Sequence, residues 1–224
     1  MRLLAFLLVL AAGVAPAGAQ PQRGASGPIL EALRRDFPLD HQAIAAPLAG
    51  KPPEEARRLA YEGIDRFLRG RRASILAAPG DSLAAIEARQ AAMLRALGRQ
   101  DLSVCAAVGD RGFFSREALA AAEPAGLADY GVALVEAAKA GAGKGSPPPA
   151  AKEDFESWLV AVDKIAPDVP VRAMLFDRAR RAAASPDHLC RGAAAMHEAV
   201  ATLAPGPRER IARTLLSSVL AASP

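Results

Sequence analysis

Apolar residues recur about every three or four positions along this chain from residue 28 onward. That spacing is the period of an α-helix, in which such residues share one face. No stretch of the sequence shows the strict alternation of apolar and polar residues that is typical of a half-buried strand. The pattern therefore predicts an all-α fold, an orthogonal or bundle-like array of about seven to nine helices in two closely packed lobes.

Proline and glycine divide this helical pattern into segments. The clearest helices are expected after Pro53 and from Asp81 or Ser82 to Gly98. The weaker pattern at 102–108 favours a helix over a short strand, and Pro124 should divide the next helical region. Four more helices are expected after residue 150, one of them unbroken from Val171 to Ala182.

The domain organisation follows from one stretch of linker composition. Residues 141–149 are rich in glycine and proline and should form a linker or a long surface loop. We therefore expect a first helical lobe at 28–140 and a second at 150–224, joined as one domain.

The N-terminus has the layout of a secretory signal peptide. Arg2 precedes an apolar run, and small residues at 17–19 are followed by polar Gln20, which predicts removal of residues 1–19 and a flexible arm at 20–27. The run of about 12 apolar residues would rise only about 18 Å as a helix, short of the roughly 30 Å hydrocarbon core of a membrane. Later apolar stretches are interrupted by charges, so no transmembrane segment is expected after cleavage. Abundant alanine, and arginine in excess of lysine, are typical of a GC-rich bacterial genome, which favours a periplasmic or secreted location.

The chain has two cysteines, Cys105 and Cys190, one in each expected lobe. Exported proteins reach an oxidising compartment, where such a pair forms a disulfide more often than it stays reduced. We therefore predict one disulfide that joins the two lobes.

The charges favour some partners and exclude others. The formal net charge is +4, and the basic residues are interspersed with acids, so a nucleic-acid partner is not expected. A solvated, ion-paired helix surface is the first interpretation of the densest basic stretch, and contact with anionic lipid or an acidic envelope protein is the alternative. The arginines of this stretch are Arg57, Arg58, Arg66, Arg69, Arg71 and Arg72.

A search for catalytic motifs finds no nucleophile elbow, phosphate-binding loop, dinucleotide fingerprint or paired-cysteine metal motif. The one concentrated group of candidate ligands is His188, Cys190 and His197 with adjacent Glu198. His188 and His197 are nine residues apart, which places them on opposite faces of a helix, and Glu198 lacks the second histidine of a zinc-protease motif. Surface or capping roles are therefore expected, with no catalytic residue, metal or cofactor.

These observations predict an exported, non-catalytic helical protein that works by binding a protein, an envelope component or a small apolar ligand. One alternative is an envelope hydrolase or metal-dependent enzyme that uses His188 or His197. A second is a peripheral membrane protein that binds through Arg57 to Arg72.

Overall fold

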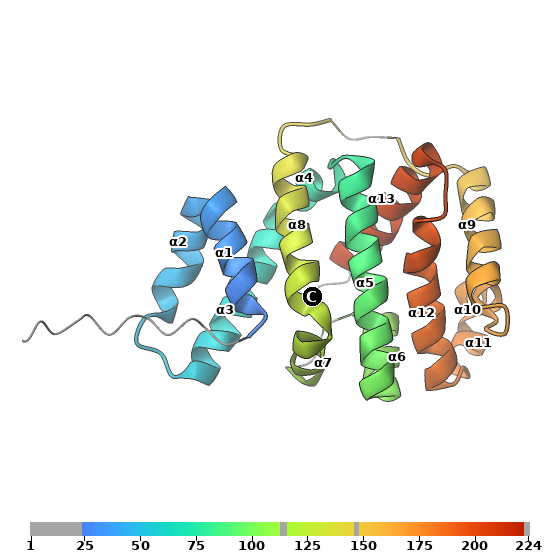
Figure 1. The fold of residues 1–224 in the computed structure, drawn as a ribbon, viewed down its shortest axis with the longest axis horizontal. Helices are drawn as coiled ribbons and strands as arrows, with labels where there is room; N and C mark the ends of the chain where they lie inside the picture. The colour runs from blue at the N-terminus through green and yellow to red at the C-terminus, as the bar shows by residue number, and fades with distance from the viewer. Residues whose placement is uncertain (1–23, 113–115, 146–147, 222–224) are drawn as a thin grey trace, which may run out of the picture.

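Five long helices lie side by side in one layer of the fold (Figure 1). In spatial order they are α1 (Ser26–Asp36), α8 (Ala128–Ala140), α5 (Gly80–Gln100), α12 (Pro186–Val200) and α9 (Lys152–Ile165). This computed structural model describes residues 24–112, 116–145 and 148–221. The predicted signal peptide lies outside the described residues.

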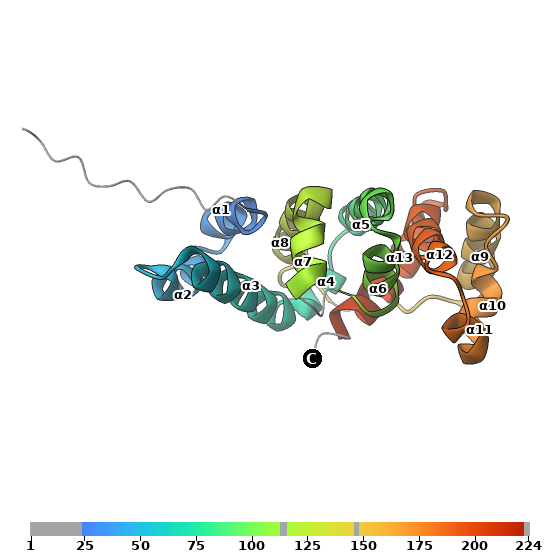
Figure 2. The same cartoon turned by 90° about the horizontal axis from the view of Figure 1, so that it is seen from below.

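A second layer packs beneath the first, as the view in Figure 2 shows. Its helices are α2 (Pro38–Ala45), α3 (Pro53–Gly70), α4 (Arg72–Leu76), α6 (Leu102–Arg111), α10 (Val171–Phe176), α11 (Arg178–Ala182) and α13 (Pro205–Ala221). A short 3₁₀ turn (Ala46–Leu48) follows α2, and α7 (Arg116–Ala122) with a π-helical turn (Glu123–Leu127) leads into α8.

The predicted all-α class is confirmed, since the described residues contain helices and no strand. Nine of the helices in this part of the chain are eight or more residues long, within the range of about seven to nine expected from periodicity. Their spatial order differs from their order in the chain, because α8 lies between α1 and α5, and α12 lies between α5 and α9. The helices before and after residues 141–149 therefore pack closely along the contact between α5 and α12.

Proline and glycine bend the chain just before α8. Pro124 lies in the π-helical turn, and Gly126 takes φ 113°, a left-handed conformation that favours glycine. The stretch Ala118–Ala140, which includes this bend, is the one described helical stretch long and apolar enough to cross a membrane. Half of its most apolar window is buried inside the fold, and a core helix meets the same criterion, so it is weak evidence for a membrane span.

Gly141 lets the end of α8 approach the end of α4. A Cβ at this position would lie 1.9 Å from the carbonyl oxygen of Ser74 and 2.6 Å from the backbone nitrogen of Ala78. Both atoms belong to the backbone, so only a residue without a side chain fits here. The start of the predicted linker is therefore also a packing position.

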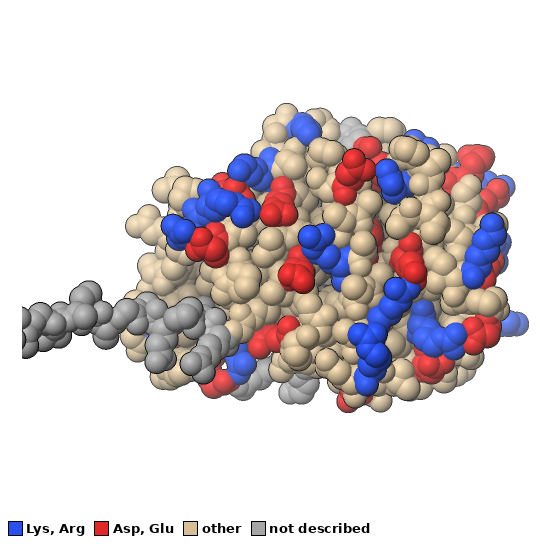
Figure 3. All heavy atoms as spheres, in the orientation of Figure 1, with Lys and Arg blue, Asp and Glu red and all other residues tan. Residues whose placement is uncertain are grey.

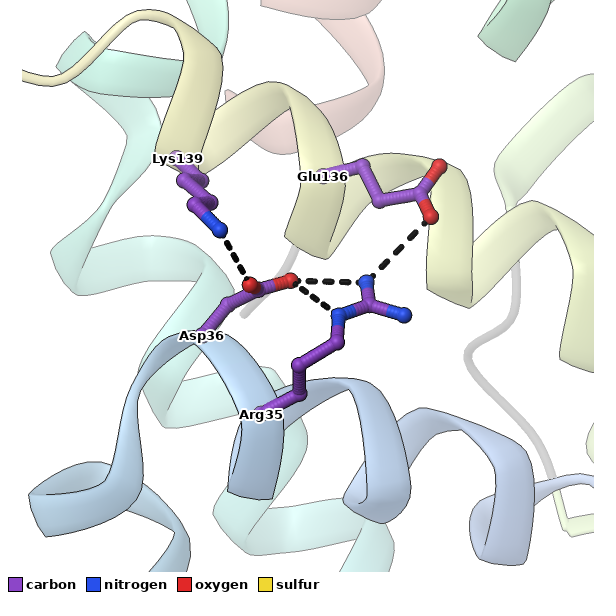
Figure 4. A network of polar contacts seen from close by, with 4 residues as sticks. All are labelled: Arg35, Asp36, Glu136 and Lys139. Atoms are coloured by element: carbon purple, nitrogen blue, oxygen red, sulfur yellow. Dashed lines mark hydrogen bonds and ion pairs between the residues drawn. The ribbon is translucent and has the colours of Figure 1, made fainter.

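A polar network joins α1 to α8 at their C-terminal ends (Figure 4). The side chain of Asp36 is almost fully buried and accepts hydrogen bonds from Arg35 (2.7 Å) and Lys139 (2.5 Å), while Arg35 also reaches Glu136 (3.3 Å). These charged partners, Arg35 first, lower the pKa of the Asp36 carboxyl. Asp36 is therefore held as a carboxylate between the two helices.

Three local predictions need correction. Helix α1 begins at Ser26, inside the expected flexible arm, because the small side chains of Ala25 and Ser26 are buried. Helix α5 begins at Gly80 after Pro79, without a side-chain cap from Asp81 or Ser82.

The third concerns the helix expected from Val171 to Ala182, which breaks at Asp177. The backbone there is extended, and the carboxylate of Asp177 accepts the backbone N–H groups of Ala179 (2.9 Å) and Arg180 (3.1 Å). Aspartate thus competes with the helical hydrogen bonds of α10 and caps α11.

Candidate functional site

A small apolar pocket opens where α6, α10, α11 and α12 meet. It holds about 50 Å³, and its walls include two of the chain's methionines, Met174 and Met196. Methionine is flexible and polarizable and is favoured at surfaces that adapt to a partner. The remaining apolar walls come from Val171, Leu175, Leu189 and Ala193.

Three exposed apolar side chains lie on helices at the end of the array that carries this pocket. Phe176 is 78% exposed, Leu175 is 37% exposed and Val160 on α9 is 49% exposed. These are three of the five large apolar residues that are exposed in the described part of the chain; the other two are Leu39 and Leu102. We call α9, α10 and α11 the array end, because Figures 1 and 2 show them at the last position of the two layers.

Phe176 lies on the exposed side of α10. Residues Val171 and Met174 of α10 are buried, whereas Phe176 is the last residue of that helix and points into solvent for most of its surface. Exposed phenylalanine is costly in water and is enriched at the centres of protein interfaces. The array end therefore has the composition of a contact surface.

The rim of the pocket is charged but locally paired. Arg181 donates to Asp110 across the pocket (2.6 Å), and Arg172 reaches Asp163 on α9 (3.3 Å). Such exposed pairs contribute little stability, so they can exchange partners when another surface approaches.

A second hollow lies between α5 and α8. It holds about 300 Å³, but the side chains that line it are charged, hydroxyl-bearing or very small: Asp81, Ser82, Ala85, Arg89, Ala133, Glu136 and Ala137. Small-molecule sites of this size usually have large apolar or aromatic walls. This hollow lacks them, and Glu136 on its wall belongs to the network around Asp36.

A buried carboxylate–imidazole pair lies between α5 and α12. Oε2 of Glu87 is 2.5 Å from Nδ1 of His197, and the two side chains are almost fully buried. Burial raises the pKa of the Glu87 carboxyl, and the neighbouring imidazole opposes that rise. Burial and the charge of Glu87 raise the pKa of Tyr130 on α8.

This pair has the residue types of an acid–base dyad but not the access. Glu87 is 0% exposed and neither residue lines the pocket at the array end or the hollow between α5 and α8. A catalytic base must reach a proton of the substrate. The pair is therefore best explained as a polar link inside the helix packing.

The other candidate ligands do not converge with it. His188 lies in the first turn of α12, where its backbone N–H is capped by Ser185, while His197 is buried near the other end of that helix. Across the described residues, no group of three histidine, cysteine or acidic side chains is placed to hold a metal. The buried position of His197 was missed from the sequence, because its partner Glu87 is 110 residues away in the chain.

The two sulfur atoms of Cys105 and Cys190 lie 2.01 Å apart, at bonding distance, and so link α6 to α12. This is the pairing predicted from the sequence. Gly98 makes room for it, since a Cβ there would lie 2.8 Å from Sγ of Cys190. A disulfide is compatible with an oxidising compartment outside the cytoplasm.

Most arginines of the basic stretch have partners within the fold. Arg71 pairs with Asp40 (2.8 Å) and lies over the ring of Phe37 (5.1 Å), and Arg72 donates to Ser217 (2.9 Å). Arg57, Arg58 and Arg69 pair with Glu54, Glu62 and Asp65 respectively, and Arg66 is exposed.

Acidic and basic residues are also interspersed on the face shown in Figure 3. Contact between Arg57–Arg72 and anionic lipid remains a prediction, and this pairing reduces the positive charge that a lipid surface would meet.

No protein-family model, curated protein or solved structure matches this chain.

Proposed function

We propose that this chain is an exported, non-catalytic binding protein whose contact surface is the array end and whose partner is a protein. The observation that carries the proposal is the set of exposed apolar residues, Val160, Leu175 and Phe176, at the end that also carries the apolar pocket. Singly scattered apolar residues are ordinary on protein surfaces, whereas adjacent exposed apolar residues beside a pocket, as Leu175 and Phe176 are, favour an interaction site.

The size of the pocket favours a protein over a small molecule. Sites for small organic ligands enclose roughly 300 to 1,000 Å³. The pocket at the array end encloses about 50 Å³, which suits the tip of one apolar side chain. A protein partner can insert such a side chain and cover Phe176 with the surface around it.

The predicted signal peptide and the disulfide support a location outside the cytoplasm. The partner would then be another protein of the bacterial envelope or exterior. A protein is one of the partners expected from the sequence.

Site-specific photo-cross-linking in the exporting cell tests this proposal. A photoreactive phenylalanine analogue replaces Phe176 in one variant and Leu39 in the control, which is 80% exposed on α2 at the opposite end. We expect a protein adduct of defined mass from position 176 and none from position 39. Absence of an adduct at 176, or the same adducts from both positions, would refute the proposal.

A further inference from the structure

We infer that the protein partner of the array end is a second copy of this chain. This inference rests on the proposed function and identifies its partner. Two features of the described residues carry it: the presence of both a projecting aromatic residue and a pocket at the array end, and the opposite charges of the helices there.

The last helix of the first layer, α9, has one buried and one exposed side. The side chains of α9 that pack toward the core are Trp158, Leu159 and Val162, and Val160 lies on the opposite side of that helix. Stacked helical arrays usually end in a repeat with a polar outer face, because nothing covers it. The outward side of α9 follows this rule apart from Val160, since its other exposed residues are Lys152, Glu153, Glu156, Ser157, Asp163 and Lys164.

A surface that binds a second copy must be complementary to itself. In a two-fold interface the same patch of both chains is in contact, so if one residue touches a second residue of the other copy, the second also touches the first. The patch must therefore carry both partners of every contact. The array end meets this requirement, since Phe176 projects into solvent within two residues of Met174, which lines the pocket. A two-fold axis between the array ends of two copies lets Phe176 of each copy approach the pocket of the other.

The charges of the array end are divided between its helices. Helix α9 exposes three acids (Glu153, Glu156, Asp163) and two lysines (Lys152, Lys164), and its fourth acid, Asp154, is buried against Arg210. Helices α10 and α11 carry four arginines (Arg172, Arg178, Arg180, Arg181), with Asp177 between the two helices. Glu156 and Asp163 flank Val160 on the outward side of α9, at spacings of four and three residues. A two-fold contact that places α9 of one copy against α11 of the other pairs opposite charges twice.

This division of charge favours a second copy over an anionic membrane. A lipid surface of uniform negative charge would attract α11 but repel the outward acids of α9. A second copy presents the opposite sign to each helix, so both contacts are favourable.

Sedimentation of the purified mature protein tests the inference. We expect a monomer–dimer equilibrium between about 1 and 100 μM, which is common for interfaces of modest size. Phe176→Ser should weaken dimerisation at least about tenfold, as truncation of a central aromatic residue does. Leu39→Ser removes an equally exposed apolar side chain at the opposite end and should leave the equilibrium unchanged.

A charge-reversal pair identifies the geometry. One variant carries Arg178→Glu and Arg180→Glu, and the other carries Glu156→Lys and Asp163→Lys. Each variant alone should become monomeric, because like charges then face each other. Their equimolar mixture should regain the dimer, since both contacts again join opposite charges, and circular dichroism should show that each variant is folded.

A wild-type protein that stays monomeric through this range, or a mixture of the two variants that stays monomeric, would overturn the inference. If the wild-type protein is monomeric while position 176 still cross-links to another protein in the cell, the proposed function stands and only the identity of the partner is wrong. If both measurements are negative, both proposals fail.

Discussion

Nδ1 of His197 lies 2.5 Å from the carboxylate of Glu87, and this contact joins α12 to α5 in the middle of the first helical layer. The disulfide lies beside the same two helices. Cys190 belongs to α12, and Gly98 of α5 lies close to its sulfur. A buried polar pair is satisfied in only one alignment of the two helices, so it favours a single packing arrangement more than it adds net stability.

Glu87→Gln should change how stability depends on pH. The pKa of Glu87 is raised in the folded protein, so the unfolded chain releases this proton at lower pH than the folded one. The stability that Glu87 contributes is therefore present below its unfolded pKa and is lost as pH rises through the folded pKa. Glutamine does not titrate, and its amide can still donate to Nδ1 of His197.

Urea unfolding at intervals from pH 4 to pH 8 measures this effect. The stability of Glu87→Gln relative to the wild type should increase as the pH rises. Glu62→Gln, an exposed control on α3, should follow the wild type throughout. Parallel curves for Glu87→Gln and the wild type would contradict the burial argument.

Gly141→Ala should destabilise the protein by about 3 kcal/mol or more, because its Cβ would overlap the backbone of the α4 segment. Gly70→Ala is the matched control, since nothing lies within 4 Å of a Cβ at that helical position. Alanine there should raise stability by up to about 1 kcal/mol. Thermal unfolding of the two variants should thus move in opposite directions.

Replacing both Cys105 and Cys190 with alanine should cost about 2 to 5 kcal/mol, because the bond closes a long loop with a sequence separation of 85 residues. A reducing agent should lower the unfolding midpoint of the wild type and leave that of the double variant unchanged. Equal sensitivity of both proteins to the reductant would show that the sulfur atoms are not bonded in solution.

Asp36→Asn should loosen α1 from α8, at a cost of about 1 to 2 kcal/mol, since the buried carboxylate loses its charge-assisted hydrogen bonds. The pKa of Asp36 is lowered in the folded protein, so its contribution is present above the unfolded pKa and is lost as pH falls through the folded value. The difference between variant and wild type should therefore shrink in acid.

Hydrogen exchange of the α1 amides, at pH 7 and at low pH, measures this difference between Asp36→Asn and the wild type. Glu31→Gln, in an exposed pair with Arg34, should not change α1 protection. A variant difference that is the same at both pH values would contradict the role of the carboxylate.

Sequence reasoning found most helices because each one depends on its own residues. The apolar spacing within Pro53–Gly70 and within Lys152–Ile165 predicts both helices without knowledge of the rest of the chain. It failed at Asp177, where the apolar spacing continues but the carboxylate caps a new helix. A break of this kind depends on which of two local hydrogen-bond patterns the tertiary packing favours.

The sequence alone did not predict the candidate site. Helical spacing places Phe176 off the buried face, because it follows Val171 by five residues and Met174 by two, but this spacing predicts neither the break at Asp177 nor the pocket beside it. The charge density of the basic stretch is evident from the sequence, yet the acids that pair with it include Asp40, from another helix.

By itself, the sequence determined the helical class and the positions of most helix ends, because these depend on local periodicity and on proline and glycine. It also determined the disulfide pairing, because the only two cysteines can pair in one way. Only the tertiary structure decided the spatial order of the helices, the partner of His197 and which apolar residues stay uncovered at the array end. Those features arise from contacts between residues distant in the chain, and a periodic apolar face does not specify which other face it meets.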